Sequence, residues 1–467
     1  MDHIFRQYDI RGKVGLELPL DQVYKLTQAI AYYFIQQNPQ IKTVAVGADG
    51  RTHSPAIKEQ VCKALQESGL NVIFVGICPT PVLYFSLFTL AHVDAGLMIT
   101  ASHNGKEYNG IKICLGKNSV WGQQIQEIKK LYKAGVICQA DSIGSYTEKP
   151  MIDYYIQWLY DHFPSLVGMQ LAAVIDCGNG AAGTVLPQLI EKMQWHKIQL
   201  LYPEVDGTYP HHEADPTVEK NMLAVQQLLA QNSSLEIGLG LDGDCDRMAP
   251  MTKQGELVAG DKLLALFAQN IVRDYPGACI VFDIKCSAGL PELLVQWGAK
   301  PSISPSGHSI IKDQMKKQHA LLAGELSCHF FFHDRYFGYD DGIYAAMRLF
   351  ELLQGGKTLS ELLAVFPKKY STPELRIECQ EWQKEIIVER IKNSFVGRSD
   401  VHMITLDGIR VTMEYGWGMI RASNTQSVVC LRFESDSLQG LERIKQEFMQ
   451  PLEYYFATTA LKQEINY

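Results

Sequence analysis

The chain has 467 residues, 46% apolar and 20% charged, which is ordinary for a globular protein but too long for one compact core. Its formal net charge of -8 leaves no basic excess to neutralise backbone phosphates, which argues against nucleic acid as a general partner. No apolar run approaches the roughly 18 residues that cross a bilayer, no secretion leader is visible, and the 11 cysteines form no CxxC pair, so we expect a cytoplasmic protein with reduced thiols and no membrane partner.

From the N-terminus to about residue 365, short apolar strands alternate with amphipathic helices. Near the start, a strand is expected at 43–47, a helix at 54–68 and a strand at 71–75. Ser54 and Pro55 are typical of an N-cap and the first helical position, and Gly69 is typical of a helix stop. This alternation predicts α/β domains with mostly parallel sheets.

Three apolar strands each run directly into a polar loop. They are expected at 95–100, 236–241 and 320–323, and the loops that follow begin at Ala101, Asp242 and Gly324. Because parallel α/β sheets bind ligands at the carboxyl ends of their strands, three such domains can direct their loops at one cleft.

The last hundred residues have a different pattern. Strands are expected at 409–415, 419–422 and 428–434, followed by a helix at 440–455, which predicts a small antiparallel α+β domain after a boundary near Pro367. The predicted fold class is therefore three mixed-sheet α/β domains of similar topology plus a C-terminal α+β domain around a central cleft. The predicted domains are 1–150, 151–252, 253–367 and 368–467.

Two glycine-rich segments resemble nucleotide-binding motifs. Residues 178–183 fit GxGxxG after a strand expected at 171–176, but these glycines suit any tight strand-to-helix turn. Residues 355–358 lack the leading glycine of a P-loop, and Thr358 with Glu361 instead predicts a capping box. Dinucleotide binding stays open as an alternative at this point.

The loop after the second strand carries Asp242, Asp244 and Asp246. Alternating carboxylates on a tight loop suit a hard divalent cation. A calcium-binding hand needs glycine and glutamate where this loop has Arg247 and Lys253, so the pattern favours magnesium that completes its coordination with phosphate or water. A solvated acidic turn is the alternative.

Ser102 follows the first of the three strands and precedes His103. The segment lacks the GxSxG elbow of α/β-hydrolases, and Lys112 follows on the same stretch of chain. Taken alone, Ser102 fits a capping serine equally well.

Two more segments suit a phosphorylated sugar. Glu325 and His329, spaced four apart around Ser327, fit one helical face that contacts sugar hydroxyls. Residues 421–425 combine a guanidinium, hydroxyls and turn amides, which suit a phosphate dianion, although an ordinary polar hairpin turn explains them too.

Together these loops resemble the α-D-phosphohexomutase family, in order and over nearly the whole chain. Residues 100–104 resemble its TASHNP serine loop, 242–247 its DGDxDR metal loop, 324–329 its GEMSGH sugar loop and 421–425 its RxSNT phosphate loop; residues 5–12 resemble its FRxYDIRG segment, and 283–287 and 307–309 match further segments. The departures are Gly105 for a usual proline, Cys328 for a usual glycine and Ala48 for a frequent arginine.

The resemblance implies a mutase that moves phosphate between C1 and C6 of a hexose through a phosphorylated Ser102. It implies Mg²⁺ between Ser102, Asp242, Asp244 and Asp246, and a hexose 1,6-bisphosphate as intermediate and activator. The further catalytic candidates that it implies are Lys112, Arg247, His308 and His103. The ligand-binding residues that it implies are Arg11, Lys285, Glu325, Ser327, His329, Arg421, Ser423, Asn424 and Thr425.

The sugar loop resembles the phosphomannomutase/phosphoglucomutase version more than the phosphoglucosamine version, in which glutamine commonly follows the glutamate. We therefore expect mannose and glucose phosphates as substrates. The alternatives are a phosphoglucosamine mutase and a non-catalytic phosphosugar-binding protein. A monomer or weak homo-oligomer is expected.

Overall fold

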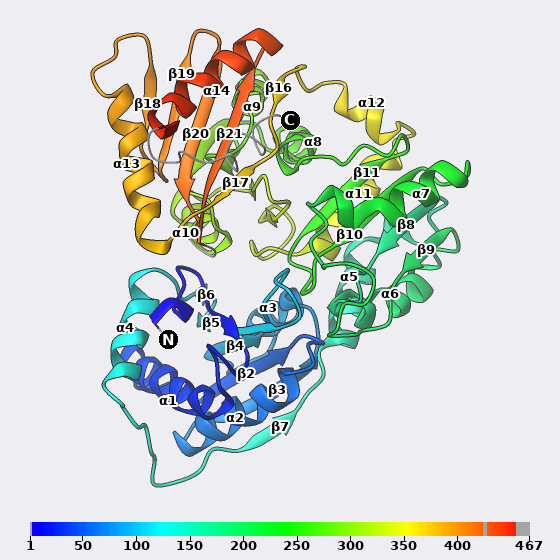
Figure 1. Cartoon of the computed structure of the whole chain (residues 1–467). Helices are drawn as coiled ribbons and strands as arrows, with labels where there is room; N and C mark the ends of the chain where they lie inside the picture. Colours follow the sequence, from blue (N-terminus) through cyan, green and yellow to red (C-terminus); the bar gives the residue numbers. More distant parts are fainter. Residues whose placement is uncertain (1, 424–426, 454–467) are drawn as a thin grey trace.

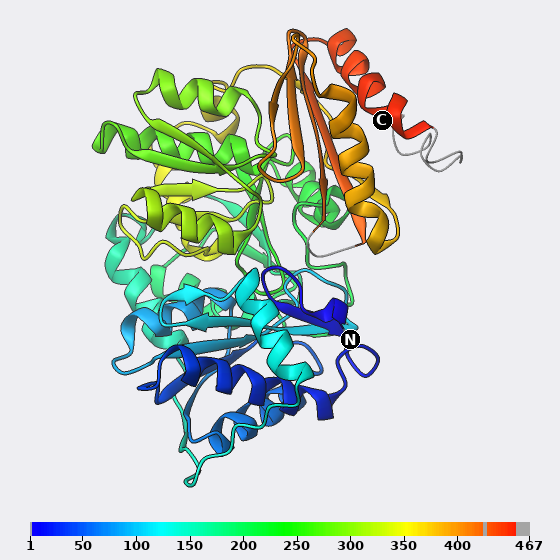
Figure 2. The same cartoon turned by 90° about the vertical axis from the view of Figure 1, so that its left-hand side faces the viewer.

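The computed structural model describes residues 2–423 and 427–453. Four β-sheets follow one another along the chain, and the first three are covered by helices. In Figure 1 the first sheet lies at the bottom, the second at the right, and the fourth at the top beside α13 (Lys384–Phe395) and α14 (Leu438–Glu453). Figure 2 shows the upper sheets standing over the first, so that the N-terminal segment faces the C-terminal sheet.

The first sheet has seven strands, and its central strands are buried on both faces. Alternate residues of β2 pack against α3 on one face and against α1, α2 and α4 on the other, which explains why these strands are apolar throughout. The strands are β1 (Ile10–Lys13), β2 (Thr43–Ala48), β3 (Asn71–Ile77), β4 (Ala95–Ile99), β5 (Tyr108–Leu115), β6 (Asn118–Ser119) and β7 (Tyr146–Glu148), and the helices are α1 (Leu20–Gln37), α2 (Ser54–Glu67), α3 (Thr80–Thr89) and α4 (Gln123–Lys133).

The second and third sheets have four strands each. The second contains β8 (Ala173–Asp176), β9 (Ile198–Leu201), β10 (Ile237–Leu241) and β11 (Met248–Thr252), with α5 (Ile152–His162), α6 (Leu186–Met193) and α7 (Leu223–Gln231). The third contains β12 (Cys279–Asp283), β13 (Lys300–Ser304), β14 (Leu322–Gly324) and β15 (Phe330–Phe332), with α8 (Gly260–Asp274), α9 (Gly289–Gln296), α10 (His308–Gln318), α11 (Gly342–Leu353) and α12 (Leu359–Leu363).

The three α/β sheets share one strand order. It reads β5-β4-β2-β3 in the first, β11-β10-β8-β9 in the second and β15-β14-β12-β13 in the third. In each, the first-named strand is antiparallel and the other three are parallel. The predicted polar loops all connect the same pair of positions, β4 to β5, β10 to β11 and β14 to β15, so the sequence repetition corresponds to a repeated topology.

The C-terminal sheet is antiparallel with six strands, and α13 and α14 pack against it. Its elements are β16 (Tyr370–Ser371), β17 (Leu375–Glu378), α13 (Lys384–Phe395), β18 (His402–Ile404), β19 (Ile409–Met413), β20 (Gly416–Ala422), β21 (Val428–Ser435) and α14 (Leu438–Glu453). The sequence predicted β19, β20, β21 and α14 within a few residues but gave no expectation for α13.

Several local predictions are settled by the backbone. Thr358 and Glu361 form the predicted capping box at α12. Ser54 was expected to be the N-cap of α2, but the N-cap is His53, and Ser54 already lies in the first turn of the helix. A Cβ at Gly183 would lie 1.7 Å from the Pro203 carbonyl oxygen, so this glycine of the GxGxxG segment is explained by close chain packing.

The N-terminal segment contacts the third domain. Gly307, at the N-cap of α10, has φ +128°, and a Cβ there would lie 2.2 Å from the Tyr8 ring. The Tyr8 hydroxyl also donates to the Ser306 carbonyl oxygen. Among the described residues no helix is long and apolar enough to cross a membrane, and all 11 cysteines are free thiols.

Candidate active site

Ser102 lies in the turn between β4 and β5 with φ +50°, a left-handed conformation that is uncommon for serine. Its amide donates to Thr100 Oγ1 at 2.9 Å. The buried guanidinium of Arg51 donates to four carbonyl oxygens of this turn, those of Ser102, Asn104, Gly105 and Tyr108, at 2.6–3.1 Å. Arg51 therefore fixes the conformation in which the serine hydroxyl is presented.

The three aspartates of the β10–β11 turn converge as predicted. Asp242, Asp244 and Asp246 are at most 1% exposed, and one oxygen from each lies within 4.8 Å of the others. Ser102 Oγ donates to Asp242 Oδ2 at 2.9 Å, so the serine turn and the aspartate turn meet directly.

Two groups from the first domain stabilise this carboxylate cluster, one by charge and one by a hydrogen bond. Lys112, on β5, pairs with Asp244 at 2.7 Å and with Asp246. Thr80, at the start of α3, donates to Asp244 Oδ2 at 2.6 Å. Asp244 Oδ1 is buried with no hydrogen-bond partner, and an unsatisfied buried carboxylate oxygen is suited to a hard divalent cation. The donor set therefore fits the predicted metal.

The aspartate pKa values reflect the electrostatic repulsion between three carboxylates that are buried close together. Burial, followed by the charges of Asp246 and Asp244, raises the pKa of Asp242 well above its usual value. Burial opposes ionisation of Asp246 too, but Lys112, His329 and Arg247 together outweigh it and hold the pKa of Asp246 well below its usual value. A bound divalent cation would relieve this mutual repulsion.

Glu325, Ser327 and His329 lie in the β14–β15 turn, so the helical face expected for them is wrong. Cys328 adopts φ +65°, and the amide of Glu325 donates to the His329 carbonyl oxygen at 3.0 Å, which closes the turn. His329 Nδ1 lies 3.2 Å from Glu325 Oε2 and 3.1 Å from Ser327 Oγ. The three side chains are brought together by a strand connection, which places them at the same edge as the metal loop.

His329 and Arg247 connect the second and third domains. Their backbones form an isolated β-bridge, and His329 Nε2 lies 3.2 Å from Asp246 Oδ1 and 3.3 Å from Arg247 Nε. Burial lowers the pKa of His329, but Asp246 and Glu325 outweigh burial and raise it to about 9. Burial also opposes the charge of Arg247, but Asp215 and Asp242 raise its pKa.

The two other histidines predicted as catalytic have depressed pKa values. His308 begins α10, and burial together with the charges of Lys312 and Lys112 holds its pKa well below the usual value. Burial and Arg247 have the same effect on His103, whose Nδ1 lies 3.1 Å from Ser102 Oγ. Both imidazoles are therefore neutral at pH 7.

The predicted ligand-binding cations are each paired with carboxylates or loop atoms. Arg11 binds Asp9 and donates to Asn104 Oδ1 at 2.6 Å. Lys285 lies 3.2 Å from Glu374, and Arg421 donates to Asp407 at 2.8 Å. These three cations reach the cavity from three different sheets.

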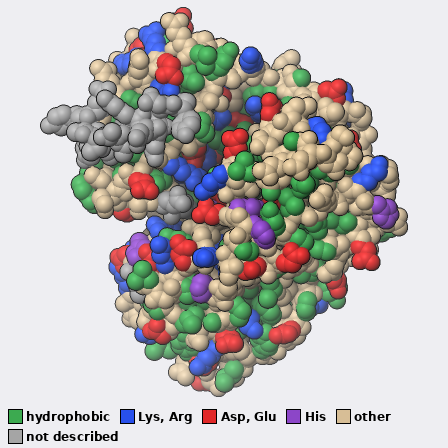
Figure 3. Space-filling model, turned by 45° about the vertical axis from the view of Figure 1, so that its right-hand side comes forward, with side chains coloured by type: hydrophobic (Ala, Val, Ile, Leu, Met, Phe, Trp, Pro, Cys, Tyr) green, Lys and Arg blue, Asp and Glu red, His purple; other side chains and the backbone are tan. Residues whose placement is uncertain are grey.

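One cavity of about 640 Å³ joins these groups. Basic side chains and histidines gather where the upper and lower parts of the molecule meet in Figure 3. The cavity is lined by nearly all of the predicted residues that the structure describes, namely Arg11, Ser102, His103, Lys112, Asp246, Arg247, Lys285, His308, Glu325, Ser327, His329, Arg421 and Ser423. Asp242 and Asp244 lie beneath it, and Asn424 and Thr425 fall outside the described residues.

Several residues at the site were missed by sequence reasoning. Arg51 and Thr80 support the serine and the aspartates, and Glu374 and Asp407 pair with cations that line the cavity. Asp340 pairs with Lys312. Arg51 follows the carboxyl end of β2, so the rule that parallel strands present ligands at that end was an available signal. Glu374 and Asp407 lie in the C-terminal domain, and no local sequence pattern predicts that this domain approaches the cleft.

Of the sequence departures, Gly105 leaves the serine turn intact. Its carbonyl oxygen binds Arg51 at 2.8 Å, and the turn conformation is held by that bond. Cys328 occupies a left-handed position that favours glycine, so the unusual residue is accommodated at some conformational cost.

Comparison with known proteins identifies the family. Four consecutive family profiles match: phosphoglucomutase/phosphomannomutase alpha/beta/alpha domain I over residues 2–136, domain II over 153–255, domain III over 259–370 and the C-terminal domain over 374–450. The chain belongs to the phosphoglucomutase/phosphomannomutase family.

Relatives match this family member over nearly their whole length. It is 41% identical to a phosphomannomutase/phosphoglucomutase of Pseudomonas syringae, over 96% of this chain and 94% of the relative. It is 38% identical to a phosphoglucomutase of Neisseria meningitidis, over 96% of both chains. A solved structure of a family protein from Burkholderia thailandensis superposes with a TM-score of 0.87 at 33% identity, covering 97% of this chain and 98% of that one.

Proposed function

We propose that this phosphohexomutase interconverts the 1-phosphates and 6-phosphates of mannose and glucose, with Ser102 as the phosphate carrier. The contact between Ser102 Oγ and Asp242 carries the proposal, because it joins a strained, presented hydroxyl to a carboxylate cluster suited to a metal. The names of relatives at 38–41% identity support the two hexoses.

In the proposed reaction, the bond between phosphorus and Ser102 Oγ breaks while a bond forms to the free sugar hydroxyl, whose proton passes to a base. The sugar bisphosphate then turns over, and its other phosphoryl group returns to Ser102. Lys112 and Arg247 place fixed positive charge at the serine, where negative charge spreads in the transition state. Ser102, Asp242, Asp244 and Asp246 would hold Mg²⁺, which would supply further charge neutralisation.

We assign the general base to His308, because it lines the cavity and its lowered pKa leaves the imidazole unprotonated at pH 7. Burial opposes the charge on Lys112, but Asp244 and Asp246 raise its pKa, so the ammonium keeps its proton, which supports a role as electrostatic stabiliser. His103 stays the reserve candidate beside the serine.

The two sugar orientations require one phosphate to be held while the other reacts. Arg421 and Ser423 line the cavity on the C-terminal sheet, and we assign them to the distal phosphate together with Asn424 and Thr425. Glu325 and Ser327 would bind ring hydroxyls, with Arg11, Lys285 and His329 positioning the ligand.

The deciding experiment compares initial rates on the 1-phosphates of mannose, glucose and glucosamine, with magnesium and a trace of hexose 1,6-bisphosphate. We expect turnover of the first two and a phosphate on Ser102 by mass spectrometry. Ser102→Ala should lower turnover at least about a thousandfold. Preference for the glucosamine substrate would favour the alternative mutase, and unchanged turnover in the alanine variant would exclude the serine mechanism.

We also propose the domain boundaries 1–150, 151–252, 253–367 and 368–467. Each sheet falls inside one of these segments, which supports the division. A cytoplasmic location, which the free thiols support, and a monomeric or weakly homo-oligomeric state are part of the same proposal.

A further inference from the structure

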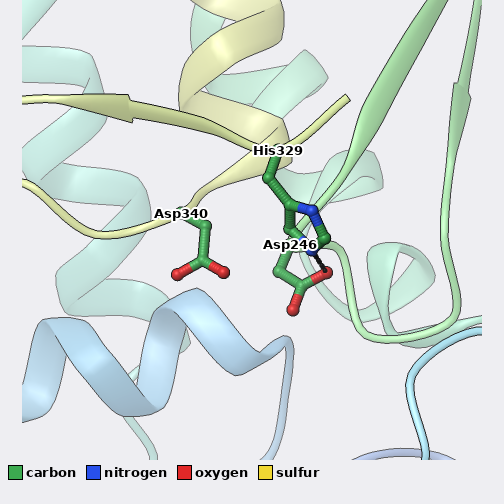
Figure 4. Close-up of side chains that lie close together, drawn as sticks. All are labelled: Asp246, His329 and Asp340. Atoms are coloured by element: carbon green, nitrogen blue, oxygen red, sulfur yellow. Dashed lines mark ion pairs between the residues drawn. The ribbon is translucent and has the colours of Figure 1, made fainter. Parts of the chain in front are cut away.

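A second group of metal-ligand atoms lies beside the aspartate cluster. Asp246, His329 and Asp340 each place one ligand atom within 4.8 Å of the others, and all three side chains are buried. Figure 4 shows the Asp246 carboxylate against the His329 imidazole, with the Asp340 carboxylate beside this pair. Only Asp246 is shared with the predicted magnesium site.

Asp340 has one carboxylate oxygen without a hydrogen-bond partner. Its side chain is 0% exposed, and Oδ1 binds Lys312 at 2.9 Å, whereas Oδ2 accepts no hydrogen bond from the described residues. The nearest polar group recorded for Oδ2 is His308 Nδ1 at 3.4 Å, which also makes no hydrogen bond. Two buried polar atoms therefore face each other without satisfying their bonding capacity, which is costly unless something binds between them.

His329 is held in the orientation of a metal ligand. Glu325 Oε2 and Ser327 Oγ contact its Nδ1, which leaves Nε2 directed at Asp246 Oδ1. A carboxylate behind one imidazole nitrogen, with the other nitrogen facing the site, is the usual support of a histidine that binds a transition metal. An ion that binds here has to displace the proton that the raised pKa of His329 keeps on this imidazole, and Arg247 Nε, 3.3 Å from Nε2, has to move aside.

We propose that Asp246, His329 and Asp340 form a second cation site, selective for Zn²⁺ over Mg²⁺, with His308 placed to complete four-coordination. An imidazole and carboxylates at a four-coordinate position match the ligands and geometry of zinc, whereas magnesium requires six oxygen ligands. The site is distinct from the aspartate cluster because Asp242 and Asp244 take no part in it. The proposed site does not depend on the proposed function, whereas its expected effect on the mutase rate does.

That consequence is inhibition. A zinc ion here occupies His329 Nε2 and draws on Asp246, which the proposed reaction needs for ligand positioning and metal binding. Zinc should therefore lower the mutase rate even when magnesium is saturating, and added hexose phosphate should oppose zinc binding because His329 lines the same cavity.

The test measures zinc binding directly, by equilibrium dialysis of ZnCl₂ against the full chain with magnesium in large excess. We expect one zinc per chain, and at least about tenfold weaker binding in Asp340→Asn. Asp341→Asn is the matched control, since this neighbouring carboxylate binds Tyr155 and Tyr336 instead of the cluster, and it should bind zinc as the unchanged chain does.

His329→Gln provides a second variant in case Asp340→Asn does not fold, and it should also lose the zinc. Zinc that binds equally well to both cluster variants, or that binds only by displacing magnesium one for one, would overturn the proposal. Neither result would touch the serine mechanism, because binding is read without turnover.

Discussion

Arg51 shows how one buried side chain can set the chemistry of another. Its guanidinium is 1% exposed and spans the serine turn through four carbonyl oxygens, while Asp49 balances its charge. The left-handed φ of Ser102 persists only because such surroundings hold it. The hydroxyl is thus directed at Asp242 by a residue that does not itself line the cavity.

Arg51→Lys should therefore remove most of the hydrogen bonds that hold the serine turn in its conformation. A lysine ammonium cannot reach four carbonyl oxygens in the planar arrangement of a guanidinium. We expect turnover to fall by about 10- to 100-fold and stability by about 2–4 kcal/mol, measured by steady-state rates and urea unfolding. Arg273→Lys, on the exposed end of α8, serves as control and should change neither quantity. Full activity in Arg51→Lys would show that the turn holds its own conformation.

At this scale, the sequence predicted the chemistry of individual residues better than their partners. Ser102, the aspartates and His329 lie where their loops suggested, because each follows a strand of the same topological position. The partners Arg51, Thr80 and Asp340 come from other loops of the chain, and only the folded sheet order brings them close. Local patterns carry no information about such long-range pairs.

The start of helix α11 contains a carboxyl group with an unusual pKa. Asp341 caps the helix through the Tyr344 amide and accepts from Tyr155 and Tyr336. Burial raises its pKa to about 6, although these hydrogen bonds oppose the shift. The folded chain therefore holds this proton more tightly than the unfolded chain does.

The pH dependence of stability follows from that difference. As pH rises from about 4 to about 6, the unfolded chain loses the Asp341 proton first, so the free energy of unfolding should fall by up to about 3 kcal/mol. Asp341→Asn should remove this contribution, measured as the difference in urea unfolding between variant and unchanged chain across that window. Asp334→Asn, which alters the pair with Arg348, should leave the Asp341 contribution in place. Parallel curves for the unchanged chain and Asp341→Asn would refute the assignment.

Helices and strands were predicted well where the periodic pattern was long. They were predicted poorly where the residues of a turn happened to have helical spacing. The four-residue spacing of Glu325 and His329 indicated a helix, but the left-handed conformation at Cys328 closes a strand connection instead. Strands β4, β10 and β14 were recognised because they are buried on both faces and therefore apolar throughout.

For the whole molecule, the aspartate cluster is the point where three domains meet. Its carboxylates come from the second domain, Lys112 from the first and His329 from the third. A bound metal therefore stabilises the arrangement of domains as well as one loop.

Chelation of metal by EDTA should accordingly lower the stability of the chain. A ligand at about 100 times its Kd contributes about 2.7 kcal/mol, so we expect a clear rise in Tm on restoring magnesium. Asp242→Asn should abolish this rise and, in EDTA, should be more stable than the unchanged chain, because it removes one of three mutually repelling carboxylates. Asp153→Asn, on exposed α5, is the control that keeps the magnesium effect. A magnesium response that survives in Asp242→Asn would place the cation elsewhere.

The C-terminal sheet is attached to the third domain by cations that bind backbone. Arg410 donates at 2.7 Å to the carbonyl oxygens of Ile284 and Cys286 and stacks 3.7 Å from the Trp417 ring, and Arg432 binds the Lys285 carbonyl oxygen. Residues 284–286 are thus held in place by the sheet that carries Arg421, although they lie in another part of the chain. A chimera that takes its C-terminal domain from a relative should exchange this tripeptide as well, because grafting at the interdomain connection alone would separate Lys285 from the sheet that positions it.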